Sequence, residues 1–247
     1  MNRCKKAYGM ILAVILLLCM VETINAGQAV SAQQWTETVE PKYEQLMERV
    51  LNEMSEFSGK GGKFTTVVFD TIEEAKRFGH LFQLYGYFGK EHVGQKVYKQ
   101  ENGWQLMLEC EDFNAASAQQ SAVIQKLTEV VNAAANRSER EKAEYFYDWV
   151  YDRMSYDESL TKKTVYDAVM DRSGVCWGFT AAYWKLCRMS GIESEAVFKG
   201  DHAWNRIRIG GEWLYSDITW DKCGGPKRWR LIPEAEMWGD RLHLEQL

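Results

Sequence analysis

Ser173-Gly174-Val175-Cys176-Trp177-Gly178 opens the stretch that decides the fold, and this stretch continues to Asp221. It runs into apolar residues spaced by three or four, and Gly191 can follow the last turn as the residue beyond the C-cap. This spacing predicts a helix of roughly 15 residues with Cys176 in its first turn. Backbone N–H groups and the positive end of the helix dipole favour a thiolate there, and they can also hold an oxyanion.

Two short strands are predicted after this helix. Residues 203–209 and 212–218 flank Gly210-Gly211, a pair that suits a two-residue hairpin turn. With that turn, His202 and Asp217 share one face as diagonal neighbours, about 7 Å apart at Cβ. The opposite face is apolar and indicates a core, made of Ile207, Ile209, Leu214 and Ile218. A slip of one residue would destroy this arrangement.

A Cys, a His and an Asp on successive elements are the parts of an activated thiol nucleophile. A cysteine at a helix start is more often structural than catalytic, but His202 and Asp217 on one face favour catalysis. A zinc site is disfavoured, because the spacing contains no compact pair such as Cys-x-x-Cys. We therefore expect no metal and no organic cofactor.

These motifs resemble those of the transglutaminase-like superfamily, within the papain-like group of thiol enzymes, in its exported bacterial type. The resemblance covers about a third of the chain, roughly residues 139–220. It rests on residues 174–179, 202–205 and 213–221, with lead-in segments at 155–157 and 164–168. It implies an α+β fold with a papain-like or transglutaminase-like core, in which the nucleophile begins a helix packed on an antiparallel sheet. A small α/β N-terminal region would precede this core.

The resemblance also implies roles for single residues. Cys176 would be the nucleophile, His202 the base and Asp217 the residue that orients the histidine. The side chains that it assigns to substrate binding or to support of the triad are Trp177, Trp204, Asn205 and Tyr166.

Several neighbours of the triad keep two interpretations. Val175 stands where true transglutaminases usually carry glutamine, so the second oxyanion donor stays unassigned. Asn205 and Asp221 either support the site or only close turns. Most tryptophans of this half are expected in the core, with one or two lining an aromatic substrate cleft. Lys227, Arg228 and Arg230 are interpreted as a solvated basic cluster.

The composition is that of an ordinary globular protein. Its 247 residues are 46% hydrophobic, 13% aromatic and 26% charged, which suffices for one good core and a small second unit. A formal net charge of −5 disfavours nucleic acid as a partner.

The N-terminus has the pattern of a secretory signal peptide. Basic residues precede an apolar run over residues 7–21, which is shorter than a typical membrane span. Cleavage is expected after Ala26 or after Ala32, and the alternative is an uncleaved anchor as the only membrane contact. Either way the protein is expected to be secreted or to lie at the cell surface.

The cysteines beyond that segment are Cys110, Cys176, Cys187 and Cys223, too few for a disulfide scaffold. Cys176 must stay a thiol if it is the nucleophile, and a bridge between two of the others is left open. Cys187 lies about three helical turns after Cys176 and is expected in the core. Cys223 is expected in an exposed Gly-rich loop.

Upstream of the Cys176 helix, the pattern predicts elements without a motif that carries chemistry. They are a helix over 33–57, a strand over 64–69, a helix over 71–84 capped by Asp70, strands over 93–98 and 104–109 around an Asn102-Gly103 turn, and a helix over 115–135. Ser138 and Glu141 predict a capping box on a helix over 139–154. A short helix over 164–170 and a last helical turn over 233–238 complete the prediction. We divide the chain into a signal peptide over 1–26 or 1–32, an α/β region over 27–137 and the catalytic core over 138–247.

Two classes of function agree with these patterns. The favoured one is an exported cysteine-dependent acyl-transfer enzyme that acts on peptide or glutamine-type amides, with peptidase-like hydrolysis ahead of cross-linking. Its partner would be a peptide, a protein or a cell-wall peptide. The alternative is a catalytically silent module on the same fold that binds cell wall or protein.

Overall fold

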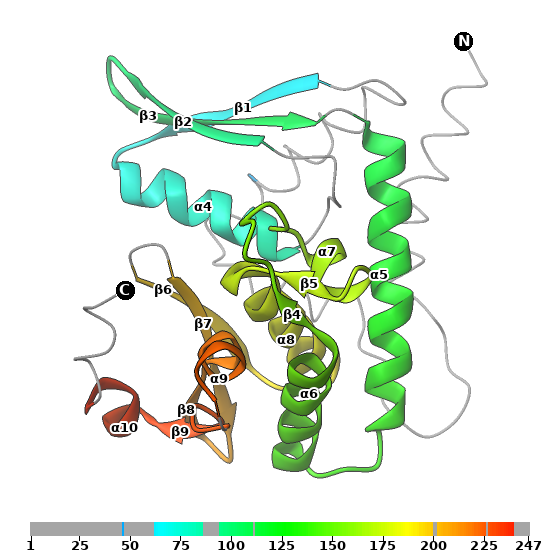
Figure 1. Cartoon of the computed structure of the whole chain (residues 1–247). Coiled ribbons are helices and arrows are strands. Elements are labelled where there is room, and N and C mark those ends of the chain that lie inside the picture. The colour runs from blue at the N-terminus through cyan, green and yellow to red at the C-terminus, as the bar shows by residue number, and fades with distance from the viewer. Residues whose placement is uncertain are drawn as a thin grey trace.

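A computed structural model of the chain describes Leu46 and residues 62–85, 94–110, 112–199, 202–225 and 227–239. Leu46 is helical, but the rest of the helix predicted over 33–57 lies outside the described residues, as does the predicted signal peptide. The described chain is a mixture of helices and mainly antiparallel sheets, so the predicted α+β class is confirmed. Two sheets lie at opposite ends of the molecule with helices between them (Figure 1).

The first sheet has three antiparallel strands in the order β1-β3-β2, and α4 packs on it. Their bounds are β1 Gly62–Phe69, α4 Ile72–Tyr85, β2 Gly94–Gln100 and β3 Gly103–Cys110. The predicted strands and the hairpin between β2 and β3 are thereby confirmed, but the two turn residues are Glu101 and Asn102, because Gly103 already pairs with Gln100. The N-cap prediction for Asp70 was wrong, because the helix begins one residue later than that cap requires. Thr71 Oγ1 takes this role and accepts the N–H of Glu74 at 3.1 Å.

Four helices form the centre of the molecule. They are α5 Phe113–Ala133, α6 Glu139–Arg153, α7 Val165–Val169 and α8 Cys176–Met189. The capping box of Ser138 and Glu141 on α6 is confirmed, and Gly191 after α8 has the expected positive φ of 81°. Helix α8 contacts each of the other three (Figure 1). The boundary predicted at residue 137 stays a prediction, and α5 before it packs on α7 and α8.

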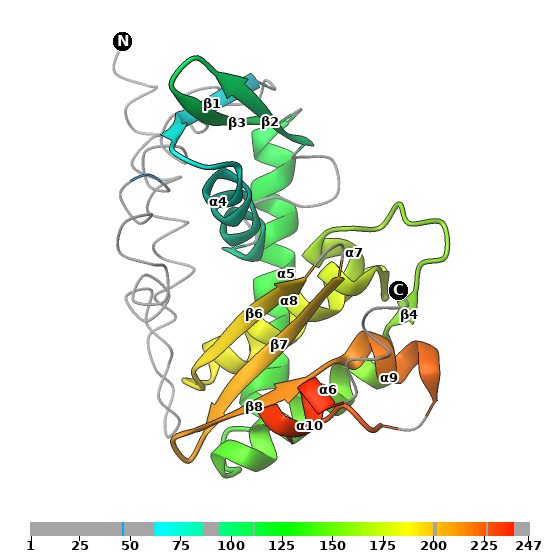
Figure 2. The same ribbon diagram turned by 90° about the vertical axis from the view of Figure 1, so that its left-hand side faces the viewer.

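The second sheet carries the predicted hairpin. Its order is β6-β7-β8-β9, all antiparallel, with β6 Ser194–Lys199, β7 His202–Ile209, β8 Glu212–Ser216 and β9 Ile232–Pro233. Asn205 pairs with Ser216 and Ile209 with Glu212, which is the predicted register. Gly210 and Gly211 have φ of 59° and 91°, the conformation that a type I′ turn demands. The sheet lies against α8, with α5 and α6 behind it (Figure 2).

The second hairpin strand is shorter than predicted. It ends at Ser216 rather than at residue 218, and α9 Ile218–Gly224 begins immediately after Asp217. Asp217 is the N-cap of this helix, because its Oδ1 accepts the N–H of Trp220 at 3.0 Å. Cys223 therefore lies in a helix rather than in the expected loop, although it is exposed as expected.

Two clusters of apolar side chains hold the second sheet. The face toward α8 joins the main core, which contains the predicted set of Ile207, Ile209, Leu214 and Ile218. A second cluster consists of Trp204, Tyr215, Trp229 and Met237, the last from α10 Glu234–Gly239. Because both clusters contain residues of β7 and β8, these strands are fixed by packing as well as by their hydrogen bonds.

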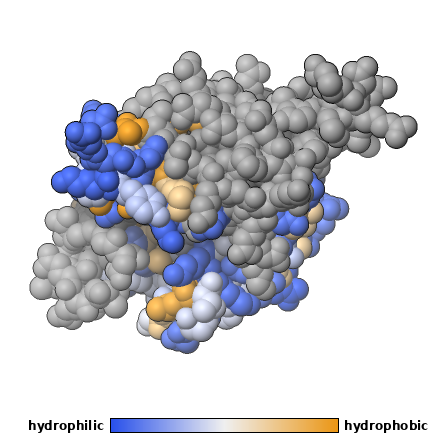
Figure 3. Space-filling view, turned by 90° about the horizontal axis from the view of Figure 1, so that it is seen from above, coloured by the Kyte–Doolittle hydropathy of each residue, from blue (hydrophilic) through white to orange (hydrophobic). Residues whose placement is uncertain are grey.

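Seen from above, the described surface is mostly hydrophilic, with small hydrophobic areas in it (Figure 3). Among the helices of the described residues, none has the length and the hydropathy that crossing a bilayer requires.

Candidate active site

The segment around Cys176 is fixed at the start of α8 by a small parallel sheet. Strand β4 (Ser155–Tyr156) pairs with β5 (Ser173–Gly174), which ends two residues before Cys176. The N–H of Val175 donates to the Lys162 carbonyl at 3.0 Å, and the N–H of Gly178 donates to the Val175 carbonyl at 2.9 Å. Cys176 is thereby the first residue of the helix, in the first turn as the sequence predicts, and it is half-buried.

The Asp157 carboxylate organises the loop that supplies the Lys162 carbonyl. It accepts the backbone N–H groups of Ser159, Thr161 and Lys162 at 3.2, 2.8 and 2.7 Å. The hydroxyl of Ser159 adds a bond at 2.6 Å, and together these donors hold the pKa of Asp157 well below its usual range. One half-buried carboxylate therefore closes the loop over 157–162 and aims its last carbonyl at the residue before Cys176.

His202 and Asp217 meet in a direct hydrogen bond. The distance from His202 Nε2 to Asp217 Oδ2 is 2.6 Å, and the two side chains are 16% and 1% exposed. His202 also forms a hydrogen bond with the side chain of Cys176. Since Nε2 is engaged by the carboxylate, Nδ1 is the ring nitrogen that remains for the sulfur. The three predicted triad residues are thus brought together from the starts of α8, β7 and α9.

These contacts change the charge state of the imidazole. Burial lowers the pKa of His202, but the hydrogen bonds to Asp217 and Cys176 outweigh burial and raise this pKa to about 9. An imidazole with this pKa is protonated at neutral pH. It can therefore neutralise a thiolate and later donate a proton to a leaving group.

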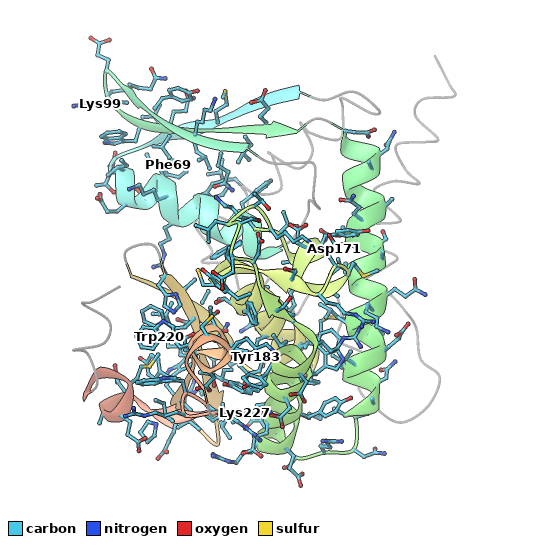
Figure 4. The ribbon with its side chains drawn as sticks, in the orientation of Figure 1. Phe69, Lys99, Asp171, Tyr183, Trp220 and Lys227 are labelled. Atoms are coloured by element: carbon cyan, nitrogen blue, oxygen red, sulfur yellow. The ribbon has the colours of Figure 1, made fainter. Side chains whose placement is uncertain are left out.

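Two tryptophan rings from different elements stack on the imidazole. The Trp204 ring stacks on His202 with centroids 5.6 Å apart, and the Trp220 ring stacks on it at 5.5 Å. Trp220, labelled in Figure 4, comes from the first turn of α9, and the Trp229 ring packs against it edge-on at 5.4 Å. The indole faces also attract a protonated ring, so they restrict the plane of the His202 ring and favour its charged form.

The other predicted site residues lie at different distances from the triad. Trp204 contacts His202 directly, whereas Asn205 is buried and donates from Nδ2 to the Thr180 carbonyl of α8 at 3.0 Å. Asn205 therefore ties β7 to the helix of the nucleophile. Trp177 and Tyr166 are half-buried and pack against the main core. A role of these residues in substrate binding stays a prediction.

Sequence reasoning missed Trp220 as a neighbour of the imidazole and Trp229 as the ring that packs against Trp220. The missed signal is Asp217 itself, which can act as the N-cap of a helix. An N-cap side chain accepts the N–H of the residue three positions later, so Trp220 is placed beside Asp217. Of the basic cluster, Lys227 lies 2.6 Å from Asp148 and Arg230 3.1 Å from the same carboxylate (Figure 4). These two cations join the last loop to α6 and are not only solvated.

The remaining described cysteines differ from Cys176 in their surroundings. Cys187 is fully buried, and burial raises its pKa. Cys223 is exposed, and its pKa is raised by partial burial and by the charges of Glu158 and Asp217. Within the described part of the chain, no three His, Cys, Asp or Glu side chains are placed to hold a metal ion.

Comparison with solved structures gives distant similarities. A crystal structure of a TGase has 16% identity and a TM-score of 0.36, covering 75% of this chain and 59% of its own. A candidate cysteine protease from Cytophaga hutchinsonii has 18% identity and a TM-score of 0.30, covering 57% and 63%. A candidate protease from Parabacteroides distasonis has 12% identity and a TM-score of 0.30, covering 50% and 35%. This chain thus spans less than two thirds of each of these structures.

Comparison with curated proteins found no match. The family model of the transglutaminase-like superfamily matches residues 125–218, which include α6, α7, α8 and the complete β7–β8 hairpin. Cys176, His202 and Asp217 all lie within that match. Residues 125–218 of this chain therefore carry its match to the transglutaminase-like superfamily.

Proposed function

We propose that this protein is an exported thiol enzyme that cleaves peptide or glutamine-type amides through a thioester, with water as the usual acceptor. The observation that carries the proposal is the hydrogen-bonded series from Cys176 through His202 to the buried carboxylate of Asp217. The match to the transglutaminase-like superfamily supports the same chemistry. The basic and apolar pattern of the N-terminal segment supports export.

The first half of the reaction transfers an acyl group to the sulfur. The Cys176 thiolate attacks the amide carbonyl, so that a carbon–sulfur bond forms and the oxygen becomes an oxyanion. Backbone N–H groups at the start of α8 can stabilise that charge. When the carbon–nitrogen bond breaks, protonated His202 gives its Nδ1 proton to the departing amine.

The second half returns the enzyme to its starting state. Neutral His202 accepts a proton from water while the oxygen of that water bonds to the thioester carbon. The carbon–sulfur bond then breaks, which releases the carboxylic acid and restores the thiolate beside a protonated imidazole. Asp217 accepts a hydrogen bond from the Nε2–H throughout the reaction, so it fixes the orientation of the ring without being protonated itself.

The expected substrate is a peptide, a protein or a cell-wall peptide. An amine in place of water would turn the same thioester into a cross-link, because both acceptors attack the same carbon. Hydrolysis needs no second binding site for an amine acceptor, and it is therefore the simpler activity.

Alkylation at pH 6 tests the activated thiol. We expect iodoacetamide to modify Cys176 at least about tenfold faster than Cys223, because the protonated His202 stabilises a thiolate at Cys176. Peptide mapping by mass spectrometry measures both rates in one sample, so exposed Cys223 is an internal control. His202→Ala should abolish the difference. Equal rates in the wild-type protein would contradict the proposal.

Titration of His202 by NMR tests the role of Asp217. The wild-type imidazole should titrate near pH 9, and in Asp217→Asn its pKa should fall to about 6.5 or below, since burial remains while the charge is lost. Because the pKa of His202 is about 9 in the folded state and about 6.5 in the unfolded chain, the protonated ring contributes to the free energy of unfolding. This contribution is complete below about pH 6.5 and disappears as the pH rises through 9. A wild-type His202 that titrates near pH 6.5 would show that the Asp217 carboxylate does not stabilise the protonated imidazole.

Substrate turnover separates the enzyme from the silent binding module. We expect the wild-type protein to release amines from a panel of peptides and cell-wall fragments, with Cys176→Ala inactive but still able to bind the same fragments. When a primary amine is added, most of the product should still be the carboxylic acid and little should be the amide of that amine. Mass spectrometry of the products measures this ratio. Binding of a polymer without turnover of any fragment would favour the module instead.

A further inference from the structure

Asp221 is a buried carboxylate that the proposed reaction does not use. It lies in α9, one turn after Asp217, and is 2% exposed. The hydroxyl of Tyr147 on α6 donates to its Oδ2. Its Oδ1 accepts the backbone N–H of Arg228 at 2.7 Å, and the N–H of Trp229 lies 3.1 and 3.0 Å from Oδ1 and Oδ2. Asp221 therefore fixes the chain that returns from α9 toward β9.

Trp229, which Asp221 holds by its N–H, contacts the catalytic half of the site in two ways. Its carbonyl accepts the backbone N–H of Asp217 at 2.8 Å, at the residue that binds His202. Its ring packs edge-on against Trp220, and Trp220 stacks on the imidazole of His202. A displacement of Trp229 would thus disturb the carboxylate and one face of the ring that this carboxylate orients.

We propose that Asp221 is a positioning residue for the thiol enzyme, because it fixes Trp229 and through it both Asp217 and the Trp220 face of His202. The proposal rests on the proposed function, since it names a residue that this site needs. It also decides between the two interpretations that the sequence leaves for Asp221, in favour of support of the site.

The chemistry of the position explains why a carboxylate stands there. An ionised carboxylate only accepts hydrogen bonds, and here all its neighbours are donors: two backbone N–H groups and a phenol. Burial and the nearby charge of Asp217 raise the pKa of Asp221 above its usual value, although the hydrogen bonds from Tyr147, Trp229 and Arg228 oppose this rise. An asparagine of the same shape would turn an N–H₂ group toward at least one donor.

Tyr147 offers a matched control. Its ring is fully buried, stacks on Tyr151 and meets Tyr183 edge-on, so a phenylalanine can occupy the same space. Tyr147→Phe removes one bond from Asp221 but leaves both backbone N–H groups bound to it. Asp221→Asn disturbs those N–H groups directly. Both variants lose a buried hydrogen bond, but only Asp221→Asn should move Trp229.

The experiment compares wild type, Asp221→Asn and Tyr147→Phe in the full chain. We expect Asp221→Asn to slow alkylation of Cys176 by iodoacetamide about tenfold or more, since small misplacements of catalytic groups have effects of this order. Tyr147→Phe should slow the alkylation of Cys176 less than about twofold. This difference should remain even if the melting temperature of Tyr147→Phe falls as far as that of Asp221→Asn. The NMR signals of the His202 ring should shift in Asp221→Asn and keep their wild-type positions in Tyr147→Phe.

Trp229→Leu supplies a further variant should Asp221→Asn not fold. It keeps the backbone bond to Asp217 but removes the ring from Trp220, so we expect shifted His202 signals and slower alkylation of Cys176. Wild-type signals and rates in Asp221→Asn, or in Trp229→Leu, would overturn the positioning role. A wild-type Cys176 no more reactive than Cys223 would instead contradict the proposed function itself, so the two failures are distinguishable.

Discussion

The hydrogen bond between His202 and Asp217 is the interaction on which the site depends. The two atoms are 2.6 Å apart, and the Asp217 carboxylate is only 1% exposed. The bond therefore gives the buried negative charge of Asp217 a partner, without which its burial would be costly. The same bond orients the imidazole so that its other nitrogen faces Cys176. It therefore links the buried interior of the second sheet to the half-buried sulfur at the start of α8.

Two other carboxylates arrange the backbone on either side of that bond. On the cysteine side, Asp157 gathers the N–H groups of a loop and aims the Lys162 carbonyl at Val175. On the histidine side, Asp221 gathers N–H groups of the last loop, whose Trp229 carbonyl holds Asp217. In both places an acceptor-only side chain satisfies several backbone donors at once, which is how an irregular segment can be rigid without regular structure.

Much of the catalytic half could be predicted from the sequence because its signals are local. Gly210 and Gly211 fix the turn and thereby the register, so the shared placement of His202 and Asp217 follows from counting. The apolar spacing after Gly174 predicts α8 in the same way. The end of β8 was misplaced because the side chain of Asp217 bonds to the backbone and starts a helix, which alternation of polar and apolar residues does not reveal.

Other features depend on contacts between distant segments and leave no local pattern. The stacking of Trp204 and Trp220 on His202 needs both β7 and α9, and strands β6 and β9 are defined by pairing with the hairpin. The cap at Thr71 rather than Asp70 is a difference of one residue between two equally suitable side chains. Tertiary structure decides such cases, because local preferences there are nearly equal.

Acylation by a small activated ester tests the central claim most directly, since it needs no knowledge of the natural substrate. The protein is mixed with p-nitrophenyl acetate at neutral pH, quenched within one turnover, and mapped by mass spectrometry. The account predicts acetyl groups on Cys176 well before Cys223, and loss of that preference in His202→Ala. Acetylation of both thiols at the same rate, or a preference that survives without the imidazole, would contradict it.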